Sequence, residues 1–138
     1  MGFFTKKLDY PELDSGNPAA EQVHEFEDQL QDLMGQVKDP LEVVPAHDHA
    51  YVFIGKPPKK YSVAKIQDGA VQSVLAADRE KGLDQLQIQK LNDQHRDAYI
   101  HNMDAERFKT NVAGKEVVVT PCSQLDQEVR DIFGSMNH

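Results

Sequence analysis

Two periods of hydrophobic residues divide this chain into predicted helices and predicted strands. Between residues 19 and 37, apolar side chains recur at steps of three and four with acidic residues between them, which predicts an amphipathic helix. Asn17 and Pro18 stand where a helix is normally capped and begun, and Pro40 follows where the pattern stops. We therefore expect an N-terminal helix that ends near residues 38–40.

Helical spacing returns twice in the second half of the chain. It predicts one long helix from about Arg79 or Leu83 to Phe108, with more apolar positions than a single stripe needs. It also predicts a final helix that starts at Cys122 or Ser123 and carries apolar side chains along one face. A helix with surplus apolar positions is either buried centrally or paired with a second copy of the chain.

Alternation with a period of two marks the strands. The stretch from residue 50 to residue 77 predicts a three-stranded antiparallel meander, with strands at 50–54, 61–66 and 70–75. Asp68 and Gly69 form a strong signal for a tight hairpin turn between the last two of them. Short apolar runs predict further strands at 41–44 and 116–120.

This order of elements is typical of an α+β fold in a single domain. We expect an antiparallel sheet of about four to five strands, the meander 50–77 plus strand 116–120, packed on one face against an N-terminal helix, one long helix and a C-terminal helix. Residues 1–18 are expected to form an irregular arm in front of the domain at 19–138, because prolines and a glycine interrupt them. Apolar residues of the arm, Phe3, Phe4, Leu8 and Tyr10, are positioned to anchor it.

Charge is unevenly distributed over these elements. The 138 residues carry a net charge of −8, yet residues 51–67 hold four lysines and no acid. Four lysines on an acidic protein are too few for the broad cationic footprint of a nucleic-acid-binding protein. No apolar run reaches the length of a membrane helix, no signal peptide is visible, and a single cysteine excludes an internal disulfide. A cytoplasmic protein is the simplest expectation.

The sharpest local cluster of candidate ligands is His47-Asp48-His49. In an extended segment residues two apart project to one side, so both imidazoles could bind one divalent transition metal. Such a site needs a third ligand, for which Glu42, His24 or a histidine of the long helix are candidates. The alternative interpretation is a polar loop with solvated histidines.

A second candidate is the loop that joins the first two strands of the meander. Lys56, Lys59 and Lys60 are displayed around two consecutive prolines, which stiffen the loop, and Tyr61 follows directly. These residues suit electrostatic docking of an acidic protein surface or a phosphorylated ligand. An ordinary solubilising hairpin loop is the alternative.

Cys122, at the predicted start of the last helix, is the third candidate. A helix N-terminus favours a thiolate, which would suit a nucleophile, although a cysteine after a strand is more often a small buried hydrophobe. No recognisable nucleophile, dinucleotide or paired-cysteine motif accompanies it. We therefore expect an acidic protein-binding accessory or regulatory protein without catalysis of its own, in which a homodimer is an option. Metal chemistry at His47 and His49 is the alternative, and a thiol-dependent enzyme is a more distant one.

Overall fold

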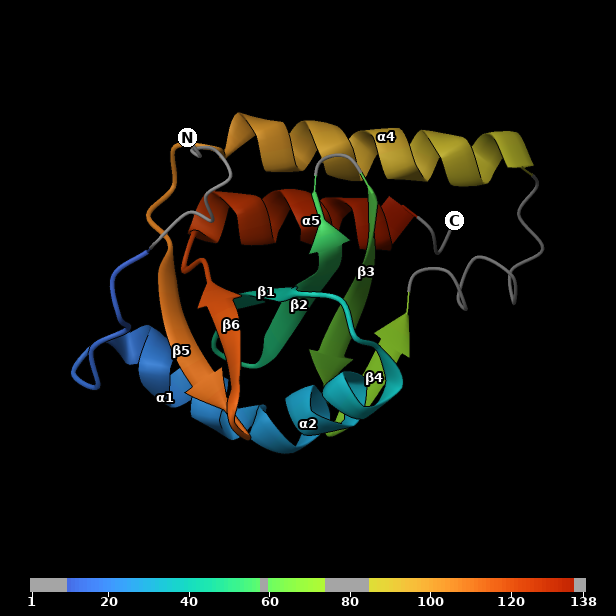
Figure 1. Ribbon diagram of the computed structural model, residues 1–138. Helices are drawn as coiled ribbons and strands as arrows, with labels where there is room; N and C mark the ends of the chain where they lie inside the picture. The colour runs from blue at the N-terminus through green and yellow to red at the C-terminus, as the bar shows by residue number, and fades with distance from the viewer. Residues whose placement is uncertain (1–9, 58–59, 74–84, 136–138) are drawn as a thin grey trace, which may run out of the picture.

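A mixed sheet runs through the middle of the protein between two layers of helices (Figure 1). The computed structural model describes residues 10–57, 60–73 and 85–135. Its helices are α1 (Pro18–Glu25), α2 (Glu27–Gln36), α4 (Gln85–His101) and α5 (Ser123–Ser135). Its strands are β1 (Leu41–Pro45), β2 (His49–Lys56), β3 (Lys60–Gln67), β4 (Ala70–Ser73), β5 (Phe108–Val112) and β6 (Lys115–Val119).

The six strands of this part of the chain are ordered β4-β3-β2-β1-β6-β5. Neighbouring strands are antiparallel, except that β1 and β6 are parallel, with Val43 opposite Val119. The α+β class is confirmed. The expected sheet of four to five antiparallel strands is corrected to a six-stranded mixed sheet, because the late pair β5–β6 adds to the outer side of β1.

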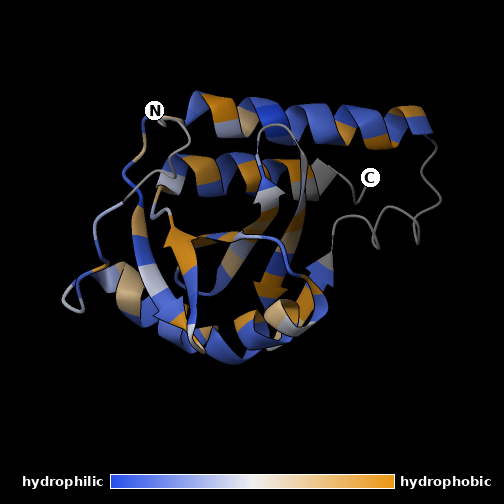
Figure 2. Cartoon of the chain, in the orientation of Figure 1, coloured by the Kyte–Doolittle hydropathy of each residue, from blue (hydrophilic) through white to orange (hydrophobic). Residues whose placement is uncertain are grey.

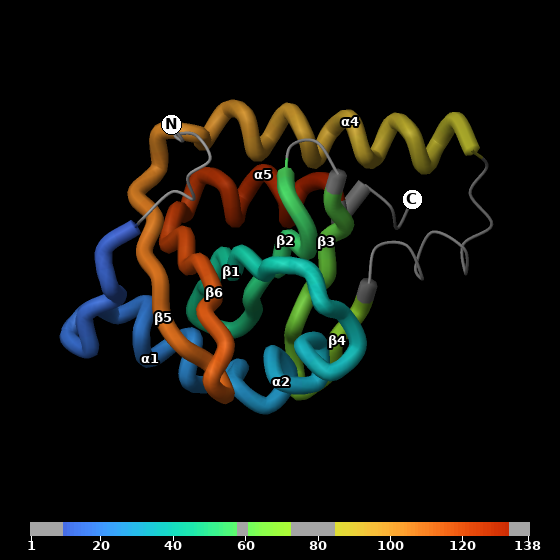
Figure 3. Tube along the Cα trace, in the orientation of Figure 1, coloured from blue at the N-terminus to red at the C-terminus, as the bar shows by residue number. Residues whose placement is uncertain are grey.

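Helices cover both faces of the sheet and not one, as the tube view makes clear (Figure 3). On one face α1 and α2 pack against residues such as Val43 and Val52, and on the other α4 and α5 pack against residues such as Val44 and Phe53. Alternate residues of the central strands therefore enter two separate cores. A strand buried on both sides shows a continuous apolar run, which carries no sign of which face a helix covers.

The N-terminal helix begins as predicted, because the Asn17 side chain accepts a hydrogen bond of 2.9 Å from the amide of Ala19. Phe26 then interrupts it with a non-helical backbone conformation, and the segment continues as α2. Phe26 is buried in the core under the sheet. The single predicted helix is thus two helices that share one buried face.

The Asp68-Gly69 hairpin is confirmed: both residues have positive φ, 55° and 76°, as a two-residue turn between strands requires. The same conformation recurs at Ala113 and Gly114, between β5 and β6. β5 was not predicted, because the long helix was expected to run to Phe108. The helix ends at His101 instead, while its expected start at residues 79–83 and the last residues of the meander lie outside the described residues.

The described part of the N-terminal arm lies along the free side of β5. Lys109 donates its amide to the carbonyl of Pro11 at 2.9 Å and accepts from the amide of Leu13 at 2.8 Å. Leu13 packs against the core formed with α1 and α2. This short parallel contact covers an exposed sheet edge. Phe3, Phe4 and Leu8 lie outside the described residues.

Among the residues that the structure describes, no helix combines the length and the apolar character that a bilayer crossing requires.

Candidate functional site

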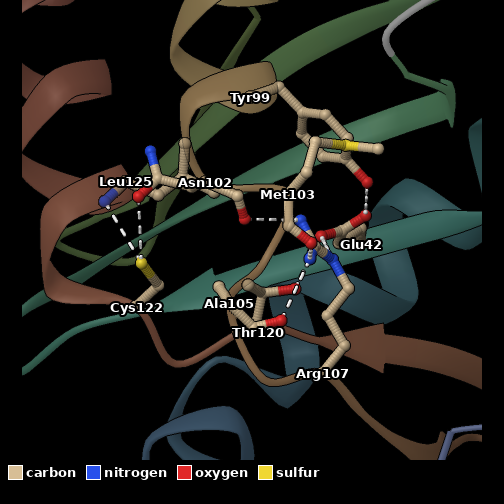
Figure 4. Close-up of polar contacts among 9 residues, drawn as sticks. All are labelled: Glu42, Tyr99, Asn102, Met103, Ala105, Arg107, Thr120, Cys122 and Leu125. Atoms are coloured by element: carbon tan, nitrogen blue, oxygen red, sulfur yellow. Dashed lines mark hydrogen bonds and ion pairs between the residues drawn. The ribbon is translucent and has the colours of Figure 1, made fainter.

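A buried polar network forms around the carboxylate of Glu42, which projects from β1 into the core under α4 (Figure 4). One oxygen accepts a hydrogen bond of 2.7 Å from the hydroxyl of Tyr99. The other accepts from Thr120 Oγ1 at 2.6 Å and from Arg107 Nε at 2.9 Å. Glu42 is 8% exposed and Arg107 is 7% exposed, so this is a buried ion pair with two further donors.

Arg107 also closes the end of α4. Its two terminal nitrogens donate to the carbonyls of Met103 and Ala105 at 3.1 Å and to that of Asn102 at 3.4 Å. These carbonyls lie in the turn that follows the helix, beyond its own hydrogen-bond ladder, and that of Asn102 also accepts from the amide of Ala105 at 3.0 Å. One side chain therefore ties the end of α4 to the middle strand of the sheet.

The charges of this network are matched to one another. Burial opposes the charge of Arg107, but the adjacent Glu42 carboxylate together with Tyr99 and Tyr10 outweighs it, and the pKa of Arg107 lies above its usual value. Burial and the same carboxylate raise the pKa of Tyr99, which keeps its phenol protonated as a donor. The guanidinium also lies 5.1 Å from the centre of the Tyr99 ring. The Glu42 network is therefore a closed arrangement that holds the fold together.

Cys122 stands immediately before α5, as predicted, and its thiol takes part in capping that helix. The sulfur accepts from the amide of Leu125 at 3.5 Å and donates to the side-chain oxygen of Asn102 at 3.4 Å (Figure 4). Asn102 in turn donates to the carbonyl of Ala98 at 2.8 Å. The thiol thus links the start of α5 to the end of α4. A nucleophilic role for it stays a prediction.

The two candidate metal ligands occupy different environments. His49 is buried at the start of β2, whereas His47 lies exposed in the loop before it. His49 Nδ1 lies 2.7 Å from a carboxylate oxygen of Asp48, and His49 Nε2 lies 2.6 Å from one of Asp126 on α5. The hydrogen bond to His49 lowers the pKa of Asp48, despite the opposing effect of desolvation.

Two carboxylates at one imidazole leave no ring nitrogen free for a metal in this arrangement. The third ligands considered are engaged elsewhere. Glu42 pairs with Arg107 and His24 with Glu27, and of the histidines of the long helix His95 bonds to the carbonyl of Leu91 and His101 pairs with Glu128. Among the described residues, no group of three or more His, Cys, Asp or Glu side chains is placed to hold a metal ion. Metal binding through His47 and His49 therefore gains no third ligand here and stays a prediction.

The predicted docking loop borders a hollow of about 500 Å³. The hollow opens at the rim of the sheet, where β2 ends, β3 begins and the chain enters β1. Its walls are formed by Asp39, Pro40, Ile54, Gly55, Lys56, Tyr61 and Ser62. Two of the four predicted contact residues, Lys56 and Tyr61, are therefore brought together, with Lys56 exposed and Tyr61 half-buried.

Two hydrogen bonds hold the walls of the hollow in place. The Tyr61 hydroxyl donates to the backbone carbonyl of Asn92 on α4 at 2.8 Å, and burial raises the pKa of Tyr61 to about 12. The amide of Gly55 donates to the carbonyl of Pro40 at 2.9 Å. Lys60 pairs with Lys56 across the start of the hairpin, and Lys59 lies outside the described residues.

Comparison with protein-family models, curated proteins and solved structures found no match. The function must therefore be argued from the chemistry of the hollow and of the surfaces around it.

Proposed function

We propose that this chain is a protein-binding accessory or regulatory protein, and that its partner presents an acidic peptide segment to the hollow at the ends of β2 and β3. One observation carries the proposal. The hollow of about 500 Å³ takes five of its seven lining residues from residues 51–67, a stretch with four lysines and no acid in a chain whose overall charge is −8. A concave surface is thus built largely from the net-positive segment of the chain, with Lys56 and Asp39 as the charged residues of its lining.

The lining suits a peptide side chain that is partly apolar. Ile54, Pro40 and the ring of Tyr61 provide apolar surface, and Lys56 stands exposed at the rim. The Tyr61 ring also packs 5.9 Å from Phe53, centre to centre, so it is held before any partner arrives. A pre-ordered aromatic ring loses little conformational freedom on binding and is a frequent anchor in protein interfaces.

Two opposite charges line the hollow, Lys56 and Asp39. Lys115 donates to the backbone carbonyl of Asp39 at 3.3 Å and so ties this part of the rim to β6. An acidic side chain is attracted to Lys56 and repelled by Asp39, so we expect the acidic group of the peptide to lie at Lys56.

The proposal assigns no catalytic step to this chain. The strongest polar clusters, around Glu42 and around His49, bond within the fold and join elements far apart in the sequence. Their hydrogen bonds account for both oxygens of Glu42 and both ring nitrogens of His49.

The test is a titration of the full chain against a fluorescently labelled acidic peptide that alternates Glu and Leu, with anisotropy as the readout. An exposed ion pair contributes about 0.2–1 kcal/mol, and reversal of Lys56 to Glu turns an attraction into a repulsion, so we expect the Kd to rise about two- to thirtyfold. Lys90→Glu on α4 makes the same change in net charge and should leave the Kd nearly unchanged.

A second pair of measurements separates the site from general electrostatics. Tyr61→Ala should weaken binding without a change in net charge, and a control peptide with Gln in place of Glu should lose most of its affinity. If Lys56→Glu and Lys90→Glu weaken binding equally, the interaction is only a response to net charge and the proposed site is wrong. Unchanged binding in both Lys56→Glu and Tyr61→Ala would reject it as well.

A further inference from the structure

The outward surface of α4 has exposed apolar side chains toward both ends of the helix, and the helix carries no net charge. Leu86 is 81% exposed, Ile100 is 47% exposed and Met103, just beyond the helix, is 52% exposed; among the described residues these are the large hydrophobic side chains left open to solvent. Figure 2 shows hydrophobic positions toward both ends of α4 and hydrophilic ones between them. Leu86 and Ile100, about 21 Å apart along the helix, offer one apolar contact at each end of this surface.

Helical geometry places these residues on one stripe. Successive residues turn by about 100°, so Leu86, Asp93 and Ile100, seven residues apart, project in nearly the same direction. Leu91, His95, Ala98 and Tyr99 are buried and project to the opposite side, toward the sheet and α5. Figure 1 shows α4 as the outermost layer above α5, so the stripe faces away from the protein body.

We infer that two copies of this chain associate through the outward face of α4, with the two helices antiparallel. Lys90 and Asp97 also lie seven residues apart and flank the stripe. When one helix is turned end to end against another about an axis near Asp93, Lys90 of each copy meets Asp97 of the other. The same turn brings Leu86 of each copy to Ile100 of the other.

A parallel arrangement does not satisfy this pattern, because it places lysine against lysine and aspartate against aspartate. Asp93, near the axis, is already paired with Arg96 of its own helix at 3.1 Å, so its charge is balanced where the two copies meet. The stripe is therefore complementary to itself in one orientation, which is what a twofold interface requires.

Net charge also favours this surface over others for self-association. The copies carry a net charge of −8 each and repel one another. Residues 85–101 hold two acidic and two basic residues, so α4 is formally neutral with its histidines uncharged. The 17 residues of α4 span about 25 Å, and a contact of this length is small among stable interfaces, so we expect a dissociation constant in the micromolar range.

Sedimentation equilibrium of the full chain at several concentrations tests the inference. The wild-type chain should dimerise, and Lys90→Glu or Asp97→Lys alone should each weaken the dimer by about tenfold, because the twofold axis repeats each altered pair. The double variant Lys90→Glu/Asp97→Lys restores opposite charges only in the antiparallel arrangement and should bring the dimer back. Lys56→Glu, outside α4, serves as the matched control for charge.

Three outcomes would overturn the inference. The wild-type chain could stay monomeric into the high micromolar range, the double variant could dissociate as readily as the single ones, or Leu86→Ser with Ile100→Ser could leave the dimer intact. All of these positions are exposed, and a circular dichroism spectrum confirms that each variant is folded. Peptide binding at the hollow is measured separately, so loss of the dimer leaves the proposed function standing.

Discussion

Replacement of Arg107 by Met should be one of the most damaging single changes in this protein. Methionine keeps an unbranched side chain as long as that of arginine up to Nε, but it removes the donor to Glu42 and the donors to three backbone carbonyls after α4. Glu42 is 8% exposed, so little water reaches its carboxylate. The variant therefore leaves a buried negative charge with only the hydroxyls of Tyr99 and Thr120 to stabilise it.

Removal of one partner from a buried ion pair typically costs about 3–5 kcal/mol, whereas replacement of both by apolar groups is often close to neutral. With total stability of about 5–15 kcal/mol, the expected loss is a large fraction. At a urea dependence of about 2 kcal/mol per molar, the unfolding midpoint should fall by about 2 M. Equilibrium unfolding followed by circular dichroism measures this shift.

The double variant Glu42→Leu/Arg107→Met provides the decisive comparison. It should be more stable than Arg107→Met alone, since the unpaired charge is gone, although Tyr99 and Thr120 lose an acceptor. If the losses of the two single variants simply add in the double one, Glu42 and Arg107 do not interact and the reasoning is refuted. A loss below about 1 kcal/mol in Arg107→Met would refute it too.

Three further predictions test the pH response and the local structure. Burial lowers the pKa of His95 below its usual 6.5. As pH falls through 6.5, this imidazole therefore binds a proton in the unfolded chain but stays neutral in the native state. The free energy of unfolding should therefore fall toward lower pH, by up to about 1.4 kcal/mol per pH unit. His95→Gln should flatten this slope in urea titrations between about pH 7.5 and 5.5. An unchanged slope would contradict the assignment to His95. Asn17→Ala should lower stability by about 1 kcal/mol in thermal unfolding through loss of the helix cap, while Asn17→Ser should be nearly neutral. Gly69→Ala should destabilise by about 1 kcal/mol because Gly69 has a φ of 76°, whereas Gly35→Ala, in a helix with no atom near the added methyl, should stabilise by about 0.5–1 kcal/mol; effects of the same sign would show that backbone conformation does not govern these sites.

Local chemistry made part of the fold predictable. Asp68 and Gly69 specify their turn by themselves, and Asn17 specifies the helix start, because each depends on neighbours only two or three residues away. β5 was missed for the complementary reason. Only Phe108 and Val112 are strongly apolar within it, so its alternation is too weak to stand apart from the helical pattern that precedes it.

The charged contacts of the core could not be predicted from local sequence patterns. Glu42 meets Arg107 across 65 residues, and His49 meets Asp126 across 77. One signal did exist: Glu42 stands within a run of apolar residues that is buried on both sides, and a charge there requires a partner of opposite sign. The partner itself depends on the parallel contact of β1 with β6, which no spacing in the sequence reveals.

That parallel contact has a consequence for how the chain is made. During synthesis β1 can pair with β2 at once, but its other edge stays open until the later strand Lys115–Val119 has been made. In the interval an apolar strand offers unpaired amides and carbonyls to any extended segment nearby. We therefore expect chains that stop before β6 to aggregate, and the sheet to form completely only after β6 has been synthesised.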